Sequence, residues 1–421
     1  MKLSFSKHLL LPPGVSADGA RLLLARGLRA FGDGFVSLLL PYYLSLLGFG
    51  ALQIGAIVTA TLLGSGVMTL GVGLIAHRFR QRTLLRAAAM LMIATGAAFA
   101  LATDFWPLLL IAAIGTMNPS TGDVSVFSPI EHALLTRTVG PAQRTALFAR
   151  YALIGTLTGA IGAQCAGLPM LATSATGIDV KRLLQLMFLL YGALGFVALL
   201  LYRRLSSGVE PHPAVPSSPL GVSKRRVYLL AAVFSIDSLG GGLVVQSLLA
   251  LWLFERFQLS VAVAGTIFFW TGMLGAFSQL AAGWLAQRIG LINTMVFTHL
   301  PANMFLILVP FMPNLPLALV FLMLRFALSQ MDIPVRTAYV MAVVTPGERP
   351  AAASVTAVPR SLAAAVSPMI AGWLLTLSPF GWPLVLCGML KIVYDLLLLS
   401  LFRHVRPSAE AHTTTTLEET K

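Results

Sequence analysis

Residues 73–82 read Gly-Leu-Ile-Ala-His-Arg-Phe-Arg-Gln-Arg, and they overlap the end of an uncharged stretch at 51–76. A related string, Gly-Trp-Leu-Ala-Gln-Arg-Ile-Gly, occupies residues 283–290 at the end of a second uncharged stretch, 257–287. The two strings begin 210 positions apart, because 283 minus 73 is 210. A basic string repeated after a long apolar stretch indicates an internal duplication.

The composition assigns the chain to the membrane proteins. Of its 421 residues, 57% are hydrophobic and 10% are charged, and the mean hydropathy is +0.85. A soluble domain of this length carries far more charge. Uncharged runs reach or exceed the roughly 20 residues that a helix needs to cross the hydrocarbon layer; they lie at 51–76, 151–178, 183–202, 257–287 and 361–390.

We therefore expect an all-α membrane protein with twelve transmembrane helices in two pseudo-symmetric six-helix bundles. The spans are placed near 27–49, 52–76, 84–103, 106–136, 144–172, 183–204, 226–254, 260–287, 291–312, 315–343, 350–377 and 380–403. With this count, the connections on one side of the membrane hold nearly all Lys and Arg residues. The opposite connections hold only Lys181, Arg182 and Arg256.

This asymmetry predicts that both termini are cytoplasmic and that the protein is integral to the plasma membrane, which in a bacterium is the inner membrane. It also accounts for the net charge of +14 without a nucleic-acid partner. The expected partners are the lipid bilayer, a small-molecule substrate, and protons or another coupling ion. We expect a monomer.

The middle of the chain has the composition of a flexible linker. Residues 203–226 carry four prolines and several serines between basic ends, a pattern typical of linkers. We expect an N-terminal six-helix bundle at 1–204, a cytoplasmic linker at 205–225, a C-terminal six-helix bundle at 226–404 and a disordered cytoplasmic tail at 405–421.

These features resemble the major facilitator superfamily of secondary transporters. The family signature after the second span is Gly, three residues, Asp, Arg or Lys, one residue, Gly, and then basic residues. Gly73 and Arg78 match it, while His77 replaces the acid and Arg80 replaces the second glycine. The resemblance implies a cytoplasmic gate at Gly73, His77 and Arg78, with Gly283 and Arg288 in the second copy.

Two interpretations of this loop stay open. In the family, the acid pairs with arginine when the carrier is open to the outside, and with His77 in that position the pairing becomes dependent on pH. Alternatively, the arginines only anchor the helices at anionic lipid and fix the topology.

The resemblance further implies that spans 1, 4, 7 and 10 line a central cavity. A charge at bilayer depth is expensive, and it marks a functional pathway unless protein groups neutralise it. Ionisable residues on these four spans are therefore the site candidates: Asp33, Asp123, Glu131, Asp237, Arg325, Asp332 and Arg336.

Span 4 contains the most irregular sequence of the chain. Residues 118–123, Asn-Pro-Ser-Thr-Gly-Asp, interrupt an apolar helix with a proline, small polar residues and a glycine. Broken helices at this depth commonly build the binding site of a transporter. On span 10, Arg325, Ser329, Asp332 and Arg336 are spaced four, three and four residues apart, which puts them on one helix face. We expect the substrate-binding residues on spans 4 and 10: Asn118, Asp123, Glu131, Arg325, Asp332 and Arg336.

Structural roles compete with these assignments. Asp332 can pair with Arg336, Asp33 with Arg29, and Glu131 with Arg150 across the hairpin of spans 4 and 5. Lys391 and Asp395 are four residues apart on span 12 and are expected to neutralise each other. His299 has no Cys, His or carboxylate at metal spacing, so we interpret it as structural.

The expected function is secondary active transport of a small solute by alternating access, as proton-coupled efflux of a small organic or cationic compound by an antiporter. Asp33, Asp123 and Asp237 are the candidate proton-coupling residues. The sequence has no Gly-Lys-Ser/Thr nucleotide loop and no Ser, His and Asp constellation, so we expect no enzyme activity, no catalytic residue, no cofactor and no metal site.

Other solutes, and a role without transport, also fit the sequence. Arg325 and Arg336 could instead hold an organic anion during uptake or export. A metal or metalloid exporter is a further possibility, and so is a membrane sensor or scaffold that keeps the fold without transport.

Overall fold

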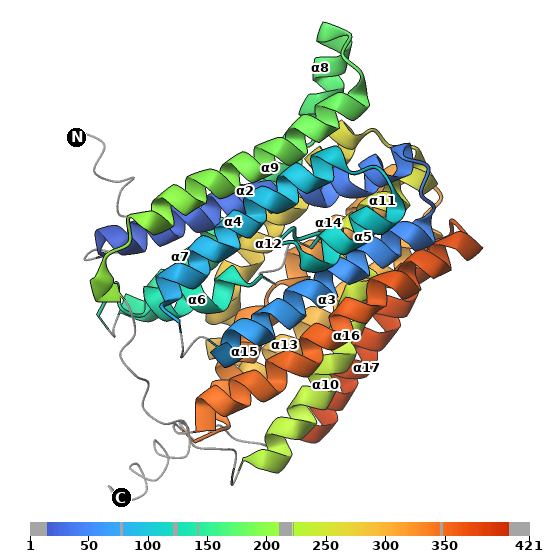
Figure 1. Cartoon of the computed structure of the whole chain (residues 1–421). Coiled ribbons are helices and arrows are strands. Elements are labelled where there is room, and N and C mark those ends of the chain that lie inside the picture. The colour runs from blue at the N-terminus through green and yellow to red at the C-terminus, as the bar shows by residue number, and fades with distance from the viewer. Residues whose placement is uncertain are drawn as a thin grey trace, which may run out of the picture. The chain divides into compact units, whose positions relative to one another are not determined.

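The computed structural model of the chain describes residues 15–75, 79–120, 125–140, 143–209, 221, 223–345 and 348–403. Among the described residues every regular element is a helix (Figure 1), which confirms the all-α fold class. Three predicted site residues, His77, Arg78 and Asp123, lie outside the described residues.

The helices of the first half of the sequence end at the linker. They are α2 (Ala17–Leu46), α3 (Ala51–Ile75), α4 (Gln81–Leu101), α5 (Phe105–Ile114), α6 (Phe127–Leu135), α7 (Arg144–Cys165), α8 (Leu168–Thr176), α9 (Val180–Arg203) and the 3₁₀ turn η2 (Ser207–Val209).

The helices of the second half follow the linker. They are α10 (Lys224–Leu243), α11 (Gln246–Phe257), α12 (Val261–Ile289), α13 (Leu291–Leu308), the 3₁₀ turn η3 (Val309–Phe311), α14 (Leu315–Ser329), α15 (Asp332–Ala342), α16 (Arg349–Leu377) and α17 (Trp382–Phe402).

Ten apolar segments of the described chain are long enough to cross a membrane. They include α10 with α11 and α14 with α15 as single segments, at Lys224–Phe257 and Leu315–Ala342. The 30-residue α2 and the broken pair α5 and α6 occupy the two remaining predicted spans. For these two, membrane crossing stays a prediction.

Three predicted spans are interrupted. Span 4 is helical to Ile114 and again from Phe127, which confirms a predicted interruption of this span; residues 121–124 lie outside the described residues. Span 7 breaks between Leu243 and Gln246, and span 10 breaks between Ser329 and Asp332. The last two breaks contain no proline, and the sequence did not predict them.

The chain packs as two compact units. Unit 1 contains residues 1–213, 245–273 and 368–379, and unit 2 contains residues 214–244, 274–367 and 380–421. The predicted halves, 1–204 and 226–404, differ from these packing units. Their division into two bundles therefore stays a prediction.

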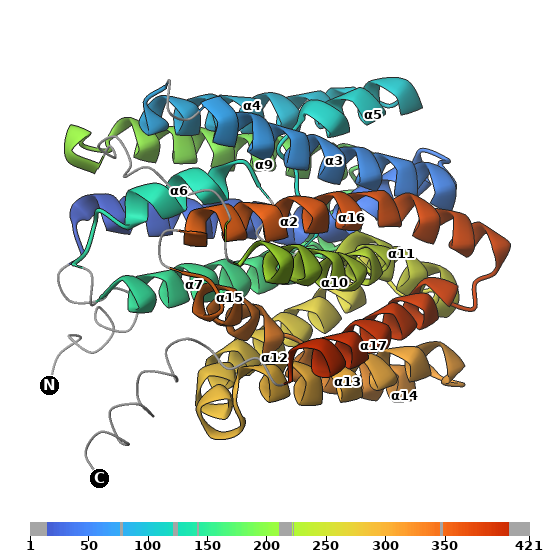
Figure 2. The same ribbon diagram turned by 90° about the horizontal axis from the view of Figure 1, so that it is seen from below.

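Unit 1 is built on close contact between α2 and its neighbours α7 and α9, while α4 packs on α9 (Figure 2). A Cβ added at Gly34 would lie 2.1 Å from the carbonyl oxygen of Gly159, and one at Gly162 would lie 2.1 Å from that of Phe31. Glycines at these contacts let the helix backbones approach closely, as is common in membrane proteins.

Two segments from the second half of the sequence also belong to unit 1. Gln246 Nε2 of α11 donates to Ser37 Oγ of α2 at 2.9 Å. The backbone N–H of Met369 donates to Thr59 Oγ1 at 2.9 Å. A Cβ at Gly372 would lie 2.5 Å from the carbonyl oxygen of Ala51. Backbones this close leave no space for side chains between them.

Unit 2 is organised around α17, which packs against α10 and α13, while α13 contacts α14 and α15 (Figure 2). Its apolar core joins aliphatic and aromatic residues from these helices, including Phe234, Met295, Val335 and Leu398. Two of its aromatic residues, Phe234 and Tyr394, lie beneath the guanidinium of Arg336.

Both ends of the linker are held by an acidic side chain. Asp18 of α2 accepts hydrogen bonds from the backbone N–H and the hydroxyl of Ser206. Glu348 accepts from the backbone N–H of Gly221 and from Thr345 Oγ1. Hydrogen bonds from the Gly221 N–H, then Ser223, then Thr345 lower the pKa of Glu348 to about 2.

We predict that Gly162→Ala lowers the free energy of unfolding by about 1–3 kcal/mol, because the added methyl group overlaps the Phe31 carbonyl. Thermal unfolding of the purified protein measures this change. Gly66→Ala is the matched control, since a Cβ there meets no atom within 4 Å. Equal effects of the two substitutions would contradict the packing described here.

We predict that Glu348→Gln lowers the unfolding temperature at neutral pH. The folded pKa of about 2 lies below the ordinary value of about 4.3, so the stabilisation is complete above pH ~4.3 and is lost as the pH falls towards 2. The difference from wild type should therefore shrink across that window. Asp104→Asn, at an exposed helix start without a capping hydrogen bond, should show no such window. A pH-independent difference for Glu348→Gln would refute this interpretation.

Candidate functional site

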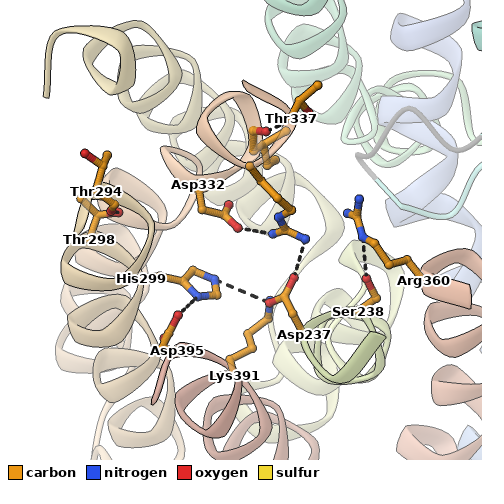
Figure 3. Close-up of polar contacts among 12 residues, drawn as sticks. Asp237, Ser238, Thr294, Thr298, His299, Asp332, Thr337, Arg360, Lys391 and Asp395 are labelled. Carbon is orange, nitrogen blue, oxygen red and sulfur yellow. Dashed lines mark hydrogen bonds and ion pairs between the residues drawn. The ribbon is translucent and has the colours of Figure 1, made fainter. Parts of the chain in front are cut away.

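The centre of unit 2 is a carboxylate shared by several cations. Asp237 on α10 accepts from Lys391 Nζ at 2.5 Å and contacts Arg336 Nη1 at 3.0 Å (Figure 3). His299 Nε2 lies 3.8 Å from the same carboxylate. Asp237 is 4% exposed. Three helices other than its own therefore deliver groups to one buried acid.

Two further acids complete this cluster. Asp332 pairs with Arg336 one turn away on α15. Asp395 on α17 lies 3.0 Å from His299 Nδ1 and accepts from Asn303 Nδ2 at 3.0 Å. We call the group of Asp237, His299, Asn303, Asp332, Arg336, Lys391 and Asp395 the unit 2 cluster.

Glycines on α10 make room for this arrangement. A Cβ at Gly240 would lie 3.3 Å from Lys391 Cγ, and one at Gly242 would lie 2.2 Å from the carbonyl oxygen of Ala364. The lysine stem can therefore pass along α10 to reach Asp237. The glycines that follow Asp237 therefore allow neighbouring helices to approach α10 closely.

Unit 1 contains a second buried ion pair. Glu131 on α6 is 0% exposed and is bound by the guanidinium of Arg29 on α2. The hydroxyls of Tyr151 and Tyr202 each donate to Glu131 at 2.6 Å. The Arg29 guanidinium also lies over the Phe127 ring, 4.2 Å from its centroid. A carboxylate with these donors is fully satisfied, as a buried charge must be.

The two ion pairs occupy corresponding predicted spans with opposite sign. In unit 1 the base, Arg29, lies on span 1 and the acid, Glu131, on span 4. In unit 2 the acid, Asp237, lies on span 7 and the base, Arg336, on span 10. The predicted duplication would therefore place a charge pair of opposite polarity on corresponding spans of the two halves.

Three expected ion pairs can be compared with the structure. The Asp332–Arg336 pair is confirmed. The predicted Glu131–Arg150 pair is wrong, because Arg29 from another helix contacts the carboxylate. The predicted direct Lys391–Asp395 pair is also wrong. Lys391 reaches Asp237, and α13 supplies the partners of Asp395.

The other predicted site residues lie on both units. Asn118 is buried in the break of span 4, where its Oδ1 accepts from the N–H and hydroxyl of Ser120. Asp33 is half-buried on α2, and Gly73 lies in α3. Gly283 and Arg288 lie on α12, where the Arg288 guanidinium stacks on Trp284 at 4.2 Å.

Several residues of the clusters were missed as site candidates. Lys391, His299 and Asp395 could have been recognised as ionisable residues at membrane depth on spans 9 and 12. Tyr151, Tyr202 and Asn303 carry no such signal in the sequence. Among the described residues, no group of three His, Cys, Asp or Glu side chains is arranged to hold a metal ion.

Arg325 on α14 differs from the other buried bases. It is 9% exposed, and within the described part of the chain it makes no ion pair. Its guanidinium lies over the Phe326 ring at 4.7 Å, and its Nε has no hydrogen-bond partner.

We predict that Glu131→Leu alone destabilises the protein by about 3 kcal/mol or more, because it leaves Arg29 buried without a counter-charge. The double substitution Arg29→Met with Glu131→Leu should recover much of this loss. A double-mutant cycle of unfolding free energies measures the coupling. If the two single effects simply add, Arg29 and Glu131 do not form the pair described.

Comparison with known proteins places this fold in a family. The family model of the Major Facilitator Superfamily matches residues 22–331 and 248–420. The chain is 25% identical over 410 residues to the uncharacterized membrane protein YJR124C of Saccharomyces cerevisiae, covering 89% of this chain and 92% of the relative.

Solved structures share the fold at low identity. A bacterial homolog of the human lysosomal transporter Spinster, in an inward-facing and unoccupied conformation, superposes with a TM-score of 0.67 at 15% identity over 92% of this chain and 95% of that chain. The nucleoside transporter NupG gives 0.69 at 15%, over 92% and 100%. The human organic anion transporter MFSD10 gives 0.60 at 17%, over 92% and 100%. The chain belongs to the major facilitator superfamily of transporters.

Proposed function

We propose that the protein is a proton-coupled secondary transporter that moves a small solute across the plasma membrane by alternating access. The observation that carries this proposal is the carboxylate of Asp237, which is shared by Lys391 and Arg336 and lies 3.8 Å from His299. A carboxylate with several competing partners can change partners when it gains or loses a proton.

The charges of the unit 2 cluster support this role. Its three acids face two permanent cations, Lys391 and Arg336, while His299 contacts Asp395 and Asp237. With a neutral His299 the cluster carries one excess negative charge. One added proton, on the imidazole or on a carboxylate, balances it. Because unbalanced charge is costly in a membrane, that proton shifts the relative stability of alternative pairings.

Other charged and titratable groups surround the cluster. Arg360 on α16 donates from Nε to Ser238, the residue after Asp237, at 3.3 Å. The Arg336 guanidinium lies over Phe234 and Tyr394, at 5.3 and 5.7 Å. Arg325 is a further buried base of unit 2 and lies on α14. Protonation of Asp237 would remove the carboxylate that pairs with Lys391 and Arg336, and both cations would then need another acceptor.

The helix breaks beside the unit 2 cluster allow the adjoining helical segments to change orientation. Asp237 lies six residues before the end of α10, and Asp332 begins α15 directly after the break in span 10. Interrupted helices in transporters commonly flank the substrate and coupling-ion sites. A change of ion pairing across α10 and α15 can therefore reorient the segments on the far side of each break.

Contacts within unit 1 suggest which part of the protein has to open during the transport cycle. The hydrogen bond between Ser37 and Gln246 and the glycine contact at Gly372 hold segments of the second half against α2 and α3. The basic connections predict that the turns after α11 and α16 face away from the cytoplasm, with both termini cytoplasmic. We propose that these contacts close the outer side and separate during the cycle.

We propose export as the direction, because protons moving inward down their gradient can drive a solute outward by exchange. A small organic solute fits an apolar membrane fold. Asp33 and the predicted residues 77, 78 and 123 remain proposals for coupling and gating. A sensor or scaffold of the same fold would move neither solute nor protons.

We predict that Asp237→Asn abolishes solute-driven proton movement. Everted vesicles carrying the protein are acidified inside, and acridine orange reports proton release while small organic cations, anions and neutral compounds are added singly. At least one compound should dequench the dye in wild type and none in Asp237→Asn. Asp104→Asn, at an exposed site, should behave as wild type. Proton movement that survives Asp237→Asn would rule out this carboxylate as the coupling group.

A further inference from the structure

Arg325 belongs to a buried stripe of α14 that also contains Ala318, Leu322 and Ser329. The spacing of four, three and four residues places these side chains on one helix face. Arg325 is 9% exposed and Ser329 is 8% exposed. A charged and a hydroxyl side chain therefore lie one turn apart on a face that is otherwise apolar.

The acids of unit 2 are already engaged. Asp237 is held by Lys391 and Arg336, Asp332 by Arg336, and Asp395 by His299 and Asn303. In the described part of unit 2, Glu348 binds the linker end instead. Each carboxylate in the described part of unit 2 therefore has other direct partners, and none of them forms an ion pair with Arg325.

Arg325 and Ser329 each contain a buried polar atom without a protein partner. Arg325 Nε and Ser329 Oγ are both buried without a hydrogen-bond partner. A guanidinium always carries its charge, and its planar N–H groups match the two oxygens of a carboxylate. Burial of such a group is strongly unfavourable unless an anion or another acceptor reaches it.

We propose that Arg325 and Ser329 bind the anionic group of the transported solute, which is then a carboxylate or a similar oxyanion. This inference rests on the proposed transport function and replaces the cationic solute that the sequence suggested. It selects Arg325 over Arg336, because Arg336 is engaged by two aspartates.

The position of these residues links anion binding to the unit 2 cluster. Arg325 and Ser329 precede the break of span 10, and Asp332 and Arg336 follow it. An anion bound before the break changes the electrostatic field at the pair after it. Solute binding and the proton site of Asp237 can thereby influence each other through one interrupted helix.

The experiment uses the full chain, purified in detergent, and thermal unfolding as the readout of binding. The probes are sodium acetate, sodium benzoate, sodium chloride and the uncharged benzamide. Arg256→Ala is the matched control, because Arg256 is exposed and also lies beside the phenylalanine that follows it, at 5.9 Å. Comparing variants in the same salt removes general effects of ionic strength.

Acetate or benzoate should raise the unfolding temperature of wild type and Arg256→Ala by a few degrees and that of Ser329→Ala by less. Neither should stabilise Arg325→Met, and benzamide should have no effect. A shift that survives in Arg325→Met, or no carboxylate-induced shift in wild type, overturns the proposal. An Arg325-dependent shift with chloride alone overturns it too, because the site then holds an inorganic ion.

A second measurement separates binding from folding. Without ligand, Arg325→Met should unfold at the wild-type temperature or above, because it removes an uncompensated charge. A lower temperature would assign Arg325 a structural role and overturn the proposal. Carboxylate binding without any proton movement in vesicles would contradict only the proposed transport function. Proton movement driven only by cations or neutral compounds would contradict only the proposed anion site.

Discussion

A charge inside a membrane-spanning helix has to be balanced by other groups of the protein, and this constraint organises both units. In unit 2, Asp237 forms ion pairs with Lys391 and Arg336 of two other helices. Asp395 forms hydrogen bonds with His299 and Asn303 of α13. In unit 1, Glu131 joins α6 to α2, α7 and α9 through Arg29 and two tyrosines. The apolar surfaces of these helices can associate in several registers, whereas few registers satisfy every buried charge.

The two ion-pair systems differ in how completely they are satisfied. Glu131 has an arginine and two hydroxyl donors, and no exposed surface. Asp237 shares Arg336 with Asp332 and lies 3.8 Å from the imidazole of His299. The first arrangement suits a permanent joint, and the second suits a group that exchanges partners. The two pairs link corresponding predicted spans, 1 with 4 and 7 with 10, with opposite polarity.

Sequence patterns predicted features that depend on one helix or one turn. The apolar runs predicted the helices, residues 118–123 predicted the break in span 4, and the four-residue spacing predicted the pair of Asp332 and Arg336. Contacts between helices were harder to predict from the sequence, because they depend on which faces of two helices pack together. The spacing of Lys391 and Asp395 suggested a pair. In the structure Lys391 instead pairs with Asp237 on α10, and Asp395 contacts His299 on α13. The same limit explains why Arg29 was not recognised as the partner of Glu131.

The most direct test of alternating access concerns the contact between Ser37 of α2 and Gln246 of α11. In a protein with Cys165→Ser and Cys387→Ser, the pair Ser37→Cys and Gln246→Cys is oxidised in proteoliposomes, and solute exchange is measured before and after reduction. Our account predicts that oxidation stops exchange and that reduction restores it, while neither single cysteine has this effect. Exchange that continues at the wild-type rate with the disulfide formed would contradict the account.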